Sequence, residues 1–134
     1  MKKTIVIVDD HILIAQALKG IIENFENFEV LYECENGKDL QEKFKLKKPI
    51  PDVVLLDVSM PIMDGFETAK WLKETHPEVL IMTLSMQNDD QSVIKMIKSG
   101  SNGYLLKNSH PIELEKALNR LLNVLNSNVI SSEL

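Results

Sequence analysis

A chain of 134 residues is about one domain's worth of sequence, and a chain of this size buries roughly two-thirds of its unfolded surface. Its 20 acidic side chains outnumber the 15 basic ones, and the net charge of −5 argues against nucleic-acid binding by these residues, because phosphate binding requires a basic face. With 44% hydrophobic and 26% charged residues, the composition is that of a folded globular protein and not of a disordered one.

The sequence carries no sign of export or of a membrane span. The single cysteine, Cys34, excludes an internal disulfide, and no Cys/His spacing resembles a zinc site. The apolar run 4–8 follows Lys2 and Lys3 but ends at Asp9, which is too short for a signal peptide, and no apolar run has membrane-spanning length. We therefore expect a cytoplasmic protein without a membrane partner.

Two hydrophobic periods alternate along the chain. Short apolar runs rich in β-branched residues predict strands buried in a parallel sheet, and apolar residues at helical spacing predict amphipathic helices. In chain order, the expected elements are a strand at 4–8, a helix at 14–25, a strand at 29–34, a helix at 38–47, a strand at 53–56, a helix at 66–75, a strand at 79–84, a helix at 91–99, a strand at 103–106 and a helix at 114–125. The strand at 29–34 carries charges and suits a sheet edge.

This order, (βα) repeated five times, predicts one α/β domain with a five-stranded parallel doubly wound sheet. We place the domain at residues 1–126. The tail 127–134 has no hydrophobic period and is predicted to be the start of a linker or a disordered tail.

Polar side chains stand where four of the five strands end. Asp9 and Asp10 follow the first strand, Asp57 the third, Ser85 the fourth and Lys107 the fifth. Ligands of doubly wound sheets bind beyond the carboxyl ends of the strands. We therefore expect these five side chains to converge on one rim.

Carboxylates gathered at one site repel each other, and a divalent cation with a preference for oxygen, such as Mg²⁺, relieves the repulsion. Asp10 and Asp57 are candidate direct ligands, Asp9 a direct or water-mediated one, and the backbone carbonyl of Ser59 completes the set. A carboxylate in such a site can also attack phosphorus and form an acyl phosphate, which makes Asp57 the candidate nucleophile.

Two further residues suit a phosphoryl group at this rim. The Lys107 ammonium can neutralise it, and the Ser85 hydroxyl can donate a hydrogen bond to it.

At these residues the sequence resembles the receiver domain of two-component response regulators, over residues 2–126. The matching segments are Asp9-Asp10, Leu55-Leu56-Asp57, Met60-Pro61, Asp64-Gly65, Ser85 and Gly103-Tyr104-Leu105-Leu106-Lys107. The first of these, extended by His11, and the last are most similar to the NarL/FixJ (LuxR-type) subfamily, whose members usually continue into a helix-turn-helix domain. The expected strand order is the flavodoxin-like 2-1-3-4-5.

The resemblance implies a phosphoacceptor switch and not an enzyme, with at most self-phosphorylation from small donors and autodephosphorylation. A sensor histidine kinase would phosphorylate Asp57 with Mg²⁺ bound, and Ser85 and Tyr104 would be the switch residues. They would alter a face made by the fourth helix, fifth strand and fifth helix, on which the phosphorylated domain could form a homodimer. Contact with DNA would require an effector domain outside these residues. The alternative is a stand-alone phosphorelay receiver without a DNA-binding output.

Other functions account for fewer of these residues. A magnesium-dependent phosphohydrolase of the haloacid-dehalogenase type needs a second acid where Ser59 stands, and a flavin- or nucleotide-binding module needs a glycine loop where Asp9 and Asp10 stand. Taken alone, Asp10 could simply cap the first helix.

Several conspicuous residues are expected to have no role in the chemistry. Without metal-ligand spacing, the histidines are expected to be solvated, and Cys34 to be a small, half-buried hydrophobic residue. The basic stretch is expected to be a solvated helix face. The histidines are His11, His76 and His110, and the lysines of the stretch are Lys43, Lys45, Lys47 and Lys48.

Overall fold

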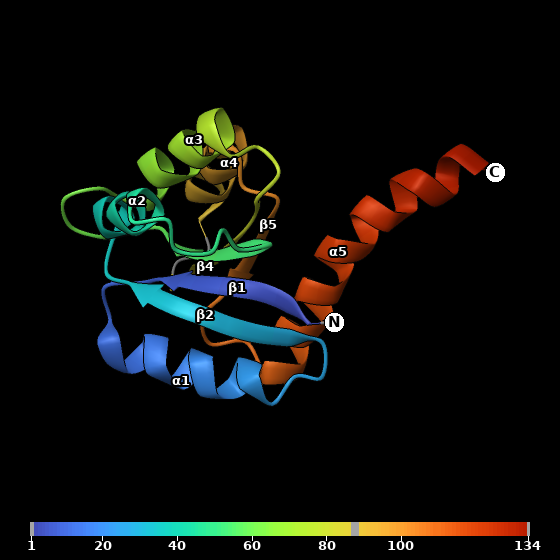
Figure 1. Cartoon of the computed structure of the whole chain (residues 1–134), viewed down its shortest axis with the longest axis horizontal. Coiled ribbons are helices and arrows are strands. Elements are labelled where there is room, and N and C mark those ends of the chain that lie inside the picture. The colour runs from blue at the N-terminus through green and yellow to red at the C-terminus, as the bar shows by residue number, and fades with distance from the viewer. Residues whose placement is uncertain (1, 87–88, 134) are drawn as a thin grey trace.

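In the part of the chain that the structure describes, five parallel strands form one sheet in the order β2-β1-β3-β4-β5 (Figure 1). The structure is a computed structural model that describes the backbone of residues 2–86 and 89–133 and, of these, the side chains up to residue 123. The elements are β1 (Lys3–Val8), α1 (Ile12–Glu23), β2 (Phe28–Cys34), α2 (Gly37–Lys45), β3 (Val53–Asp57), α3 (Gly65–Thr75), β4 (Leu80–Ser85), α4 (Asp90–Ser99), β5 (Gly103–Leu106) and α5 (Pro111–Glu133). The predicted (βα)₅ order, the parallel sheet and its strand order are confirmed.

Helices cover both faces of the sheet, with α1 and α5 on one side and α2, α3 and α4 on the other (Figure 1). The alternation of side chains along β1 shows why both faces need a cover. Ile5 and Ile7 pack into the cluster with Leu18 and Leu118, whereas Val6 and Val8 pack into a second cluster on the opposite face. A strand that is apolar on both faces is therefore buried on both, as its sequence predicts.

Polar side chains define where three of the helices begin. Asn36, Asp64 and Asp89 precede α2, α3 and α4, and the side chain of each accepts a hydrogen bond from a backbone N–H three residues later. Such caps satisfy one of the free N–H groups at a helix start. The helix α4 ends at Gly100, whose φ of 121° lies in the region that favours glycine.

The helix α5 is longer than expected. Its backbone is helical to Glu133, whereas the sequence favoured a helix to residue 125 and an irregular tail after 126. No proline or glycine follows Pro111, so nothing interrupts the helical hydrogen bonds. The end of α5 projects away from the sheet (Figure 1). The side chain of Leu125 lies outside the described residues, so the boundary between domain and linker stays a prediction. None of the described helices is long and apolar enough to cross a membrane.

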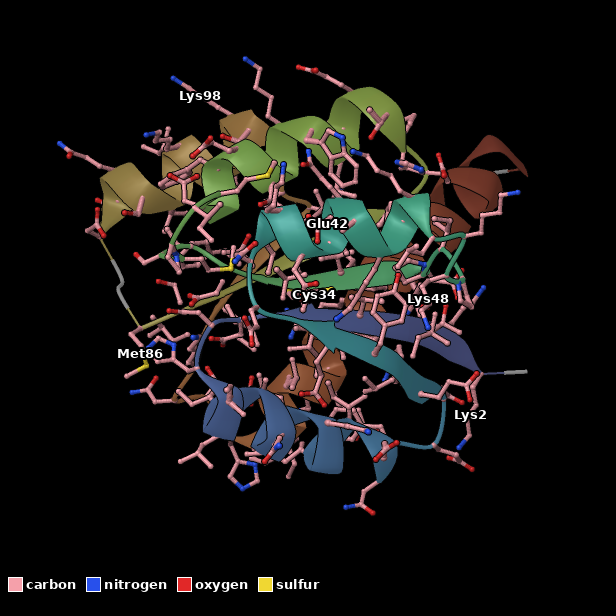
Figure 2. The ribbon with its side chains drawn as sticks, turned by 60° about the vertical axis from the view of Figure 1, so that its left-hand side comes forward. Lys2, Cys34, Glu42, Lys48, Met86 and Lys98 are labelled. Atoms are coloured by element: carbon pink, nitrogen blue, oxygen red, sulfur yellow. The ribbon has the colours of Figure 1, made fainter. Side chains whose placement is uncertain are left out.

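Cys34 is more buried than expected. The residue ends β2 and lies beneath α2 (Figure 2), where only 2% of it is exposed. Burial raises the pKa of its thiol to about 12. Although β2 is an edge strand, α2 covers its last residue, and the thiol is a protonated core group.

The basic stretch is only partly solvated. Lys45, Lys47 and Lys48 are exposed, but Lys43 donates a hydrogen bond to the carbonyl oxygen of Glu33 at 2.6 Å and pairs with Asp39 at 3.3 Å. This lysine therefore ties α2 to β2.

Two of the histidines have structural roles. The ring of His76 packs edge-on against Phe44, with centroids 4.9 Å apart. His110 is exposed as expected, and its Nδ1 accepts the N–H of Ile112 at the start of α5.

Substitution of two glycines by alanine should change the free energy of unfolding in opposite directions. Gly20 lies exposed inside α1 with nothing within 4 Å of an added Cβ, so Gly20→Ala should raise the free energy of unfolding by roughly 0.5–1 kcal/mol. At Gly65 the added Cβ would collide with the carbonyl oxygen of Asp57 and lie 2.8 Å from the Cα of Val58, so Gly65→Ala should lower it by roughly 1–3 kcal/mol. Urea unfolding of both variants checks this pair; equal effects at the two positions would contradict it.

Candidate functional site

The ends of four strands place polar side chains at one edge of the sheet. Asp57 is the last residue of β3 and Ser85 the last residue of β4, while Asp9 directly follows β1 and Lys107 directly follows β5. Backbone hydrogen bonds hold the two residues outside the strands: the Asp9 N–H donates to the Cys34 carbonyl at 2.9 Å, and the Lys107 N–H donates to the Ser85 carbonyl at 2.9 Å. The positions of these groups are therefore fixed by the sheet itself.

A buried ammonium joins two buried carboxylates at this edge. The Nζ of Lys107 lies 2.7 Å from Oδ2 of Asp9 and 3.2 Å from Oδ2 of Asp57. The three side chains are 3%, 3% and 6% exposed, in the order Lys107, Asp9 and Asp57. A lysine that follows a strand is commonly solvated, and only its partners explain why this one is buried. The group carries one positive and two negative charges.

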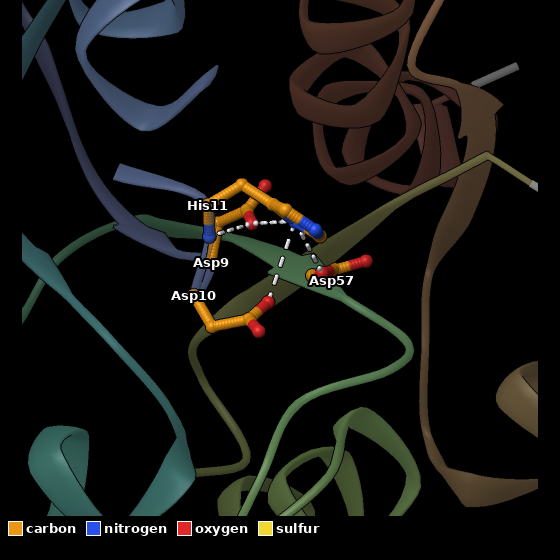
Figure 3. A group of neighbouring side chains, drawn as sticks. All are labelled: Asp9, Asp10, His11 and Asp57. Atoms are coloured by element: carbon orange, nitrogen blue, oxygen red, sulfur yellow. Dashed lines mark hydrogen bonds and ion pairs between the residues drawn. The ribbon is translucent and has the colours of Figure 1, made fainter. Parts of the chain in front are cut away.

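His11 belongs to the same cluster, which the sequence analysis did not foresee. Its Nδ1 lies 3.0 Å from Oδ1 of Asp9, 3.4 Å from Oδ1 of Asp10 and 3.8 Å from Oδ2 of Asp57 (Figure 3). The backbone N–H of His11 also donates to Oδ1 of Asp9, at 2.9 Å, and this turn brings the ring back over the carboxylates. The sequence predicted a solvated histidine, but only 54% of this side chain is exposed, and its ring nitrogen contacts the carboxylates. Its position directly after Asp9 and Asp10 was the available signal.

The third carboxylate, Asp10, does not cap α1. His11 holds the N-cap position of that helix and makes no side-chain cap. Oδ1 of Asp10 and Oδ2 of Asp57 are buried and have no hydrogen bond of acceptable geometry among the described residues. One oxygen from each of the three aspartates and one nitrogen of His11 lie within 4.8 Å of one another. Carboxylate oxygens gathered in this way, with one ammonium among them, suit a hard cation.

Burial raises the pKa of the Asp57 carboxyl. Desolvation is the largest cause, the Lys107 ammonium opposes it, and the Asp9 carboxylate adds to it. The ion pair with Lys107 therefore does not fully offset the cost of holding the Asp57 charge in this place.

The loop after Asp57 returns the chain to α3. Asp64 accepts the N–H of Glu67 at 2.9 Å and caps α3, and Gly65 donates its N–H to the Val58 carbonyl at 2.8 Å. Ser59 is exposed in this loop, two residues beyond Asp57, and its carbonyl as a metal ligand stays a prediction.

The family model of the response regulator receiver domain matches residues 5–119. The chain belongs to this family. The transcriptional regulatory protein DegU from Brevibacillus brevis is 38% identical over 106 residues, which cover 79% of this chain and 44% of DegU. The chemotaxis protein CheY from Thermotoga maritima is 34% identical over 121 residues, which cover 90% of this chain and 98% of CheY.

A solved receiver domain has the same fold. The signal receiver domain of the response regulator NarL from Mycobacterium tuberculosis superposes with a TM-score of 0.81 at 28% identity, over 89% of this chain and 94% of that one. This likeness agrees with the NarL/LuxR-type subfamily inferred from the motifs. The chain spans about half the length of the first curated relatives that it matches.

The two residues predicted to act as switch residues lie on the neighbouring strands β4 and β5. Ser85 is 3% exposed and pairs with Leu106 in the sheet, one position beyond the pairing of Asp57 with Leu84. Tyr104 is half-buried in β5 and packs against the cluster that α4 covers. Ser85 therefore lies at the strand ends that carry the site, and Tyr104 lies on the face of the sheet that α4 covers.

The electrostatics of the receiver domain predict that loss of the Asp57 charge stabilises it. Because the pKa of Asp57 is raised in the folded state, its ionised form costs stability as the pH rises from the ordinary pKa of an aspartate through the folded value. Asp57→Asn should therefore raise the midpoint of thermal unfolding in metal-free buffer at pH 7. The gain should disappear towards pH 3, where the carboxyl of the wild-type protein is neutral.

Circular dichroism melting curves between pH 3 and pH 8 measure this difference. The control is Glu42→Gln, which removes an exposed charge from α2 and should shift the midpoint little at any pH. A less stable Asp57→Asn variant at pH 7 would show that the Lys107 ion pair outweighs desolvation.

Proposed function

We propose that Asp57 accepts a phosphoryl group from a sensor histidine kinase or a small phosphodonor, with Mg²⁺ bound. The observation that carries the proposal is the buried contact of Lys107 with Asp9 and Asp57, at 2.7 Å and 3.2 Å. A purely structural lysine would not need two carboxylates. One ammonium and two carboxylates leave a net negative charge at the rim of the domain, where a cation and a phosphoryl group can bind.

In the proposed transfer, a carboxylate oxygen of Asp57 attacks phosphorus and forms an acyl phosphate. The bond from phosphorus to the histidine nitrogen of the kinase breaks, and its electron pair stays on that imidazole. The Lys107 ammonium is placed to hold the charge of a phosphoryl oxygen, and the Ser85 hydroxyl supplies a second donor. These two groups stabilise the negative charge and do not themselves exchange protons with the phosphoryl group.

The residues present fit the proposed magnesium ion. Asp9, Asp10 and Asp57 would hold it together with the carbonyl of Ser59, and the gathering of three carboxylates beside one ammonium supports this assignment. When bound, Mg²⁺ supplies positive charge to the phosphoryl oxygens.

We further propose that Ser85 and Tyr104 relay phosphorylation to a face formed by α4, β5 and α5. The outer surface of α4 carries two large apolar side chains, Ile94 and Ile97, which are 51% and 54% exposed. Exposed apolar groups of this kind suit contact with a second protein surface. The partner proposed for the phosphorylated state is a second copy of this chain.

The proposed role of the whole protein is that of a transcriptional regulator in the cytoplasm, with this chain as its regulatory domain. DegU supports this proposal, because it is a transcriptional regulatory protein about twice as long as the matched region. The less favoured alternative is a stand-alone phosphorelay receiver, for which the match over 98% of CheY is the supporting observation. Because DNA phosphates repel a domain with a net charge of −5, any DNA contact is proposed to be made by another domain. The chain itself is proposed to be a phosphoacceptor and not an enzyme, beyond self-phosphorylation and autodephosphorylation.

The acceptor role is tested with acetyl phosphate and Mg²⁺. We expect intact mass spectrometry to find one phosphoryl group on the wild-type chain, none without Mg²⁺ and none on Asp57→Asn. A matched control, Asp52→Asn, removes an exposed carboxylate that contacts Thr4 and should leave the adduct unchanged. An adduct that persists on Asp57→Asn would refute the assignment.

The proposed dimer face is tested by sedimentation velocity with beryllofluoride, which mimics the phosphoryl group. The wild-type chain should sediment faster after beryllofluoride and Mg²⁺ are added, and the double variant Ile94→Ser, Ile97→Ser should not. The variant should still accept a phosphoryl group, because both side chains lie on α4 and outside the carboxylate cluster. A wild-type sedimentation coefficient that beryllofluoride leaves unchanged would count against the dimer.

A further inference from the structure

The nitrogen of His11 occupies a central place among the carboxylates of the site. Nδ1 faces one oxygen of each of the three aspartates, Asp9, Asp10 and Asp57 (Figure 3). Two of these oxygens, on Asp10 and Asp57, are buried without a hydrogen bond of acceptable geometry among the described residues. A histidine that only capped a turn would need Asp9 and would have no reason to approach the other two.

The distances fit a coordination shell. Two ligands at about 2.1 Å from one ion lie about 3.0 Å apart when they are adjacent in an octahedron and about 4.2 Å apart when they are opposite. The separations of Nδ1 from the three oxygens are 3.0, 3.4 and 3.8 Å, which lie within that range. Small adjustments of the half-exposed ring would bring the nitrogen into the same shell as the carboxylates.

We infer that His11 is a nitrogen ligand at this site and sets its preference among divalent ions. This inference rests on the proposed function, because it uses the same carboxylates as the magnesium site. Mg²⁺ favours a shell of oxygens, whereas imidazole nitrogen is a good ligand for first-row transition metals, in the order Mn²⁺, Co²⁺, Ni²⁺ and Cu²⁺ of increasing affinity. The site therefore binds Mn²⁺ and Co²⁺ through three aspartates and one imidazole.

Ligation uses the neutral imidazole with its hydrogen on Nε2 and its lone pair on Nδ1. The contact of Nδ1 with Asp9 at 3.0 Å is a hydrogen bond when Nδ1 carries the hydrogen, and the bound ion takes the place of that hydrogen. The side chain of His11 is 54% exposed, so its surroundings include water as well as the carboxylates.

Pulsed electron paramagnetic resonance of bound Mn²⁺ tests the ligand directly. The full 134-residue chain should show a ¹⁴N coupling to Mn²⁺ that is absent from His11→Phe. The control, His76→Phe, keeps an aromatic ring against Phe44 and should retain the coupling. Mn²⁺ that binds the wild-type chain without nitrogen coupling would overturn the inference and leave the proposed function standing. Failure to bind Mn²⁺ or Mg²⁺ at all would instead remove the proposed function.

Titration calorimetry measures the preference itself. His11→Phe should lower the affinity for Co²⁺ by at least about tenfold and change that for Mg²⁺ by less than about threefold, because only Co²⁺ gains from the nitrogen. The half-exposed position of His11 allows the ring to be replaced without a core cavity, and an unchanged thermal midpoint verifies the fold. If His11→Phe instead tightened the binding of both ions, His11 would be an obstruction and not a ligand, and the inference would be wrong.

Discussion

The ion contact of Lys107 with Asp9 and Asp57 is the constraint on which the site depends. The three residues come from different strands, and β4 lies between β3 and β5 in the sheet. Lys107 must therefore reach Asp57 across the end of β4, where the small Ser85 stands. Removing the ammonium would leave two buried carboxylates without a counter-charge, a loss that typically costs about 3–5 kcal/mol, so the strand register that places Lys107 also stabilises the site. A slip of one residue in β5 would turn the lysine to the other face of the sheet.

The same contact leaves the site short of positive charge. Two carboxylates share one ammonium, Asp10 adds a third carboxylate, and the pKa of Asp57 is raised as a result of its burial. Replacing a buried group of charges with apolar side chains of the same volume often leaves stability unchanged or raises it, so stability alone does not explain these residues. An excess of buried negative charge that costs stability is expected at a binding site, because a bound cation then supplies the missing positive charge. The stability of the domain and the proposed binding of a cation and a phosphoryl group are therefore opposed at Asp57.

The sequence was sufficient for the layers because they follow from short-range patterns, whereas the strand order came from the resemblance to a known family. Runs such as 53–56 are apolar on both faces and belong inside the sheet, and the position of Asp57 and Lys107 at strand ends brought them to one edge. Features that depend on a single turn or on what covers a residue were less accessible. The ring of His11 joins the site because one backbone hydrogen bond to Asp9 turns it back, and Cys34 is buried because α2 covers the edge strand. The backbone of α5 is helical past residue 126, because backbone hydrogen bonds between successive turns need no hydrophobic period.

The site and the outer face of the domain are joined by a short, tightly bonded segment. The Lys107 N–H is bonded to the Ser85 carbonyl, and deeper in the sheet Ser101 bonds both the Thr83 hydroxyl and the Gly103 carbonyl, each at 2.7 Å. The strands β4 and β5 are thus held together at both ends of their contact, and Tyr104 lies between these two points. Because close-packed interiors transmit displacement, the proposed shift of Ser85 or Lys107 towards a phosphoryl group on Asp57 would have to move β5 or strain these bonds. Because β5 has only four residues, either response would reach the start of α5, and the proposed switch from a local charge to a changed surface would need no long relay.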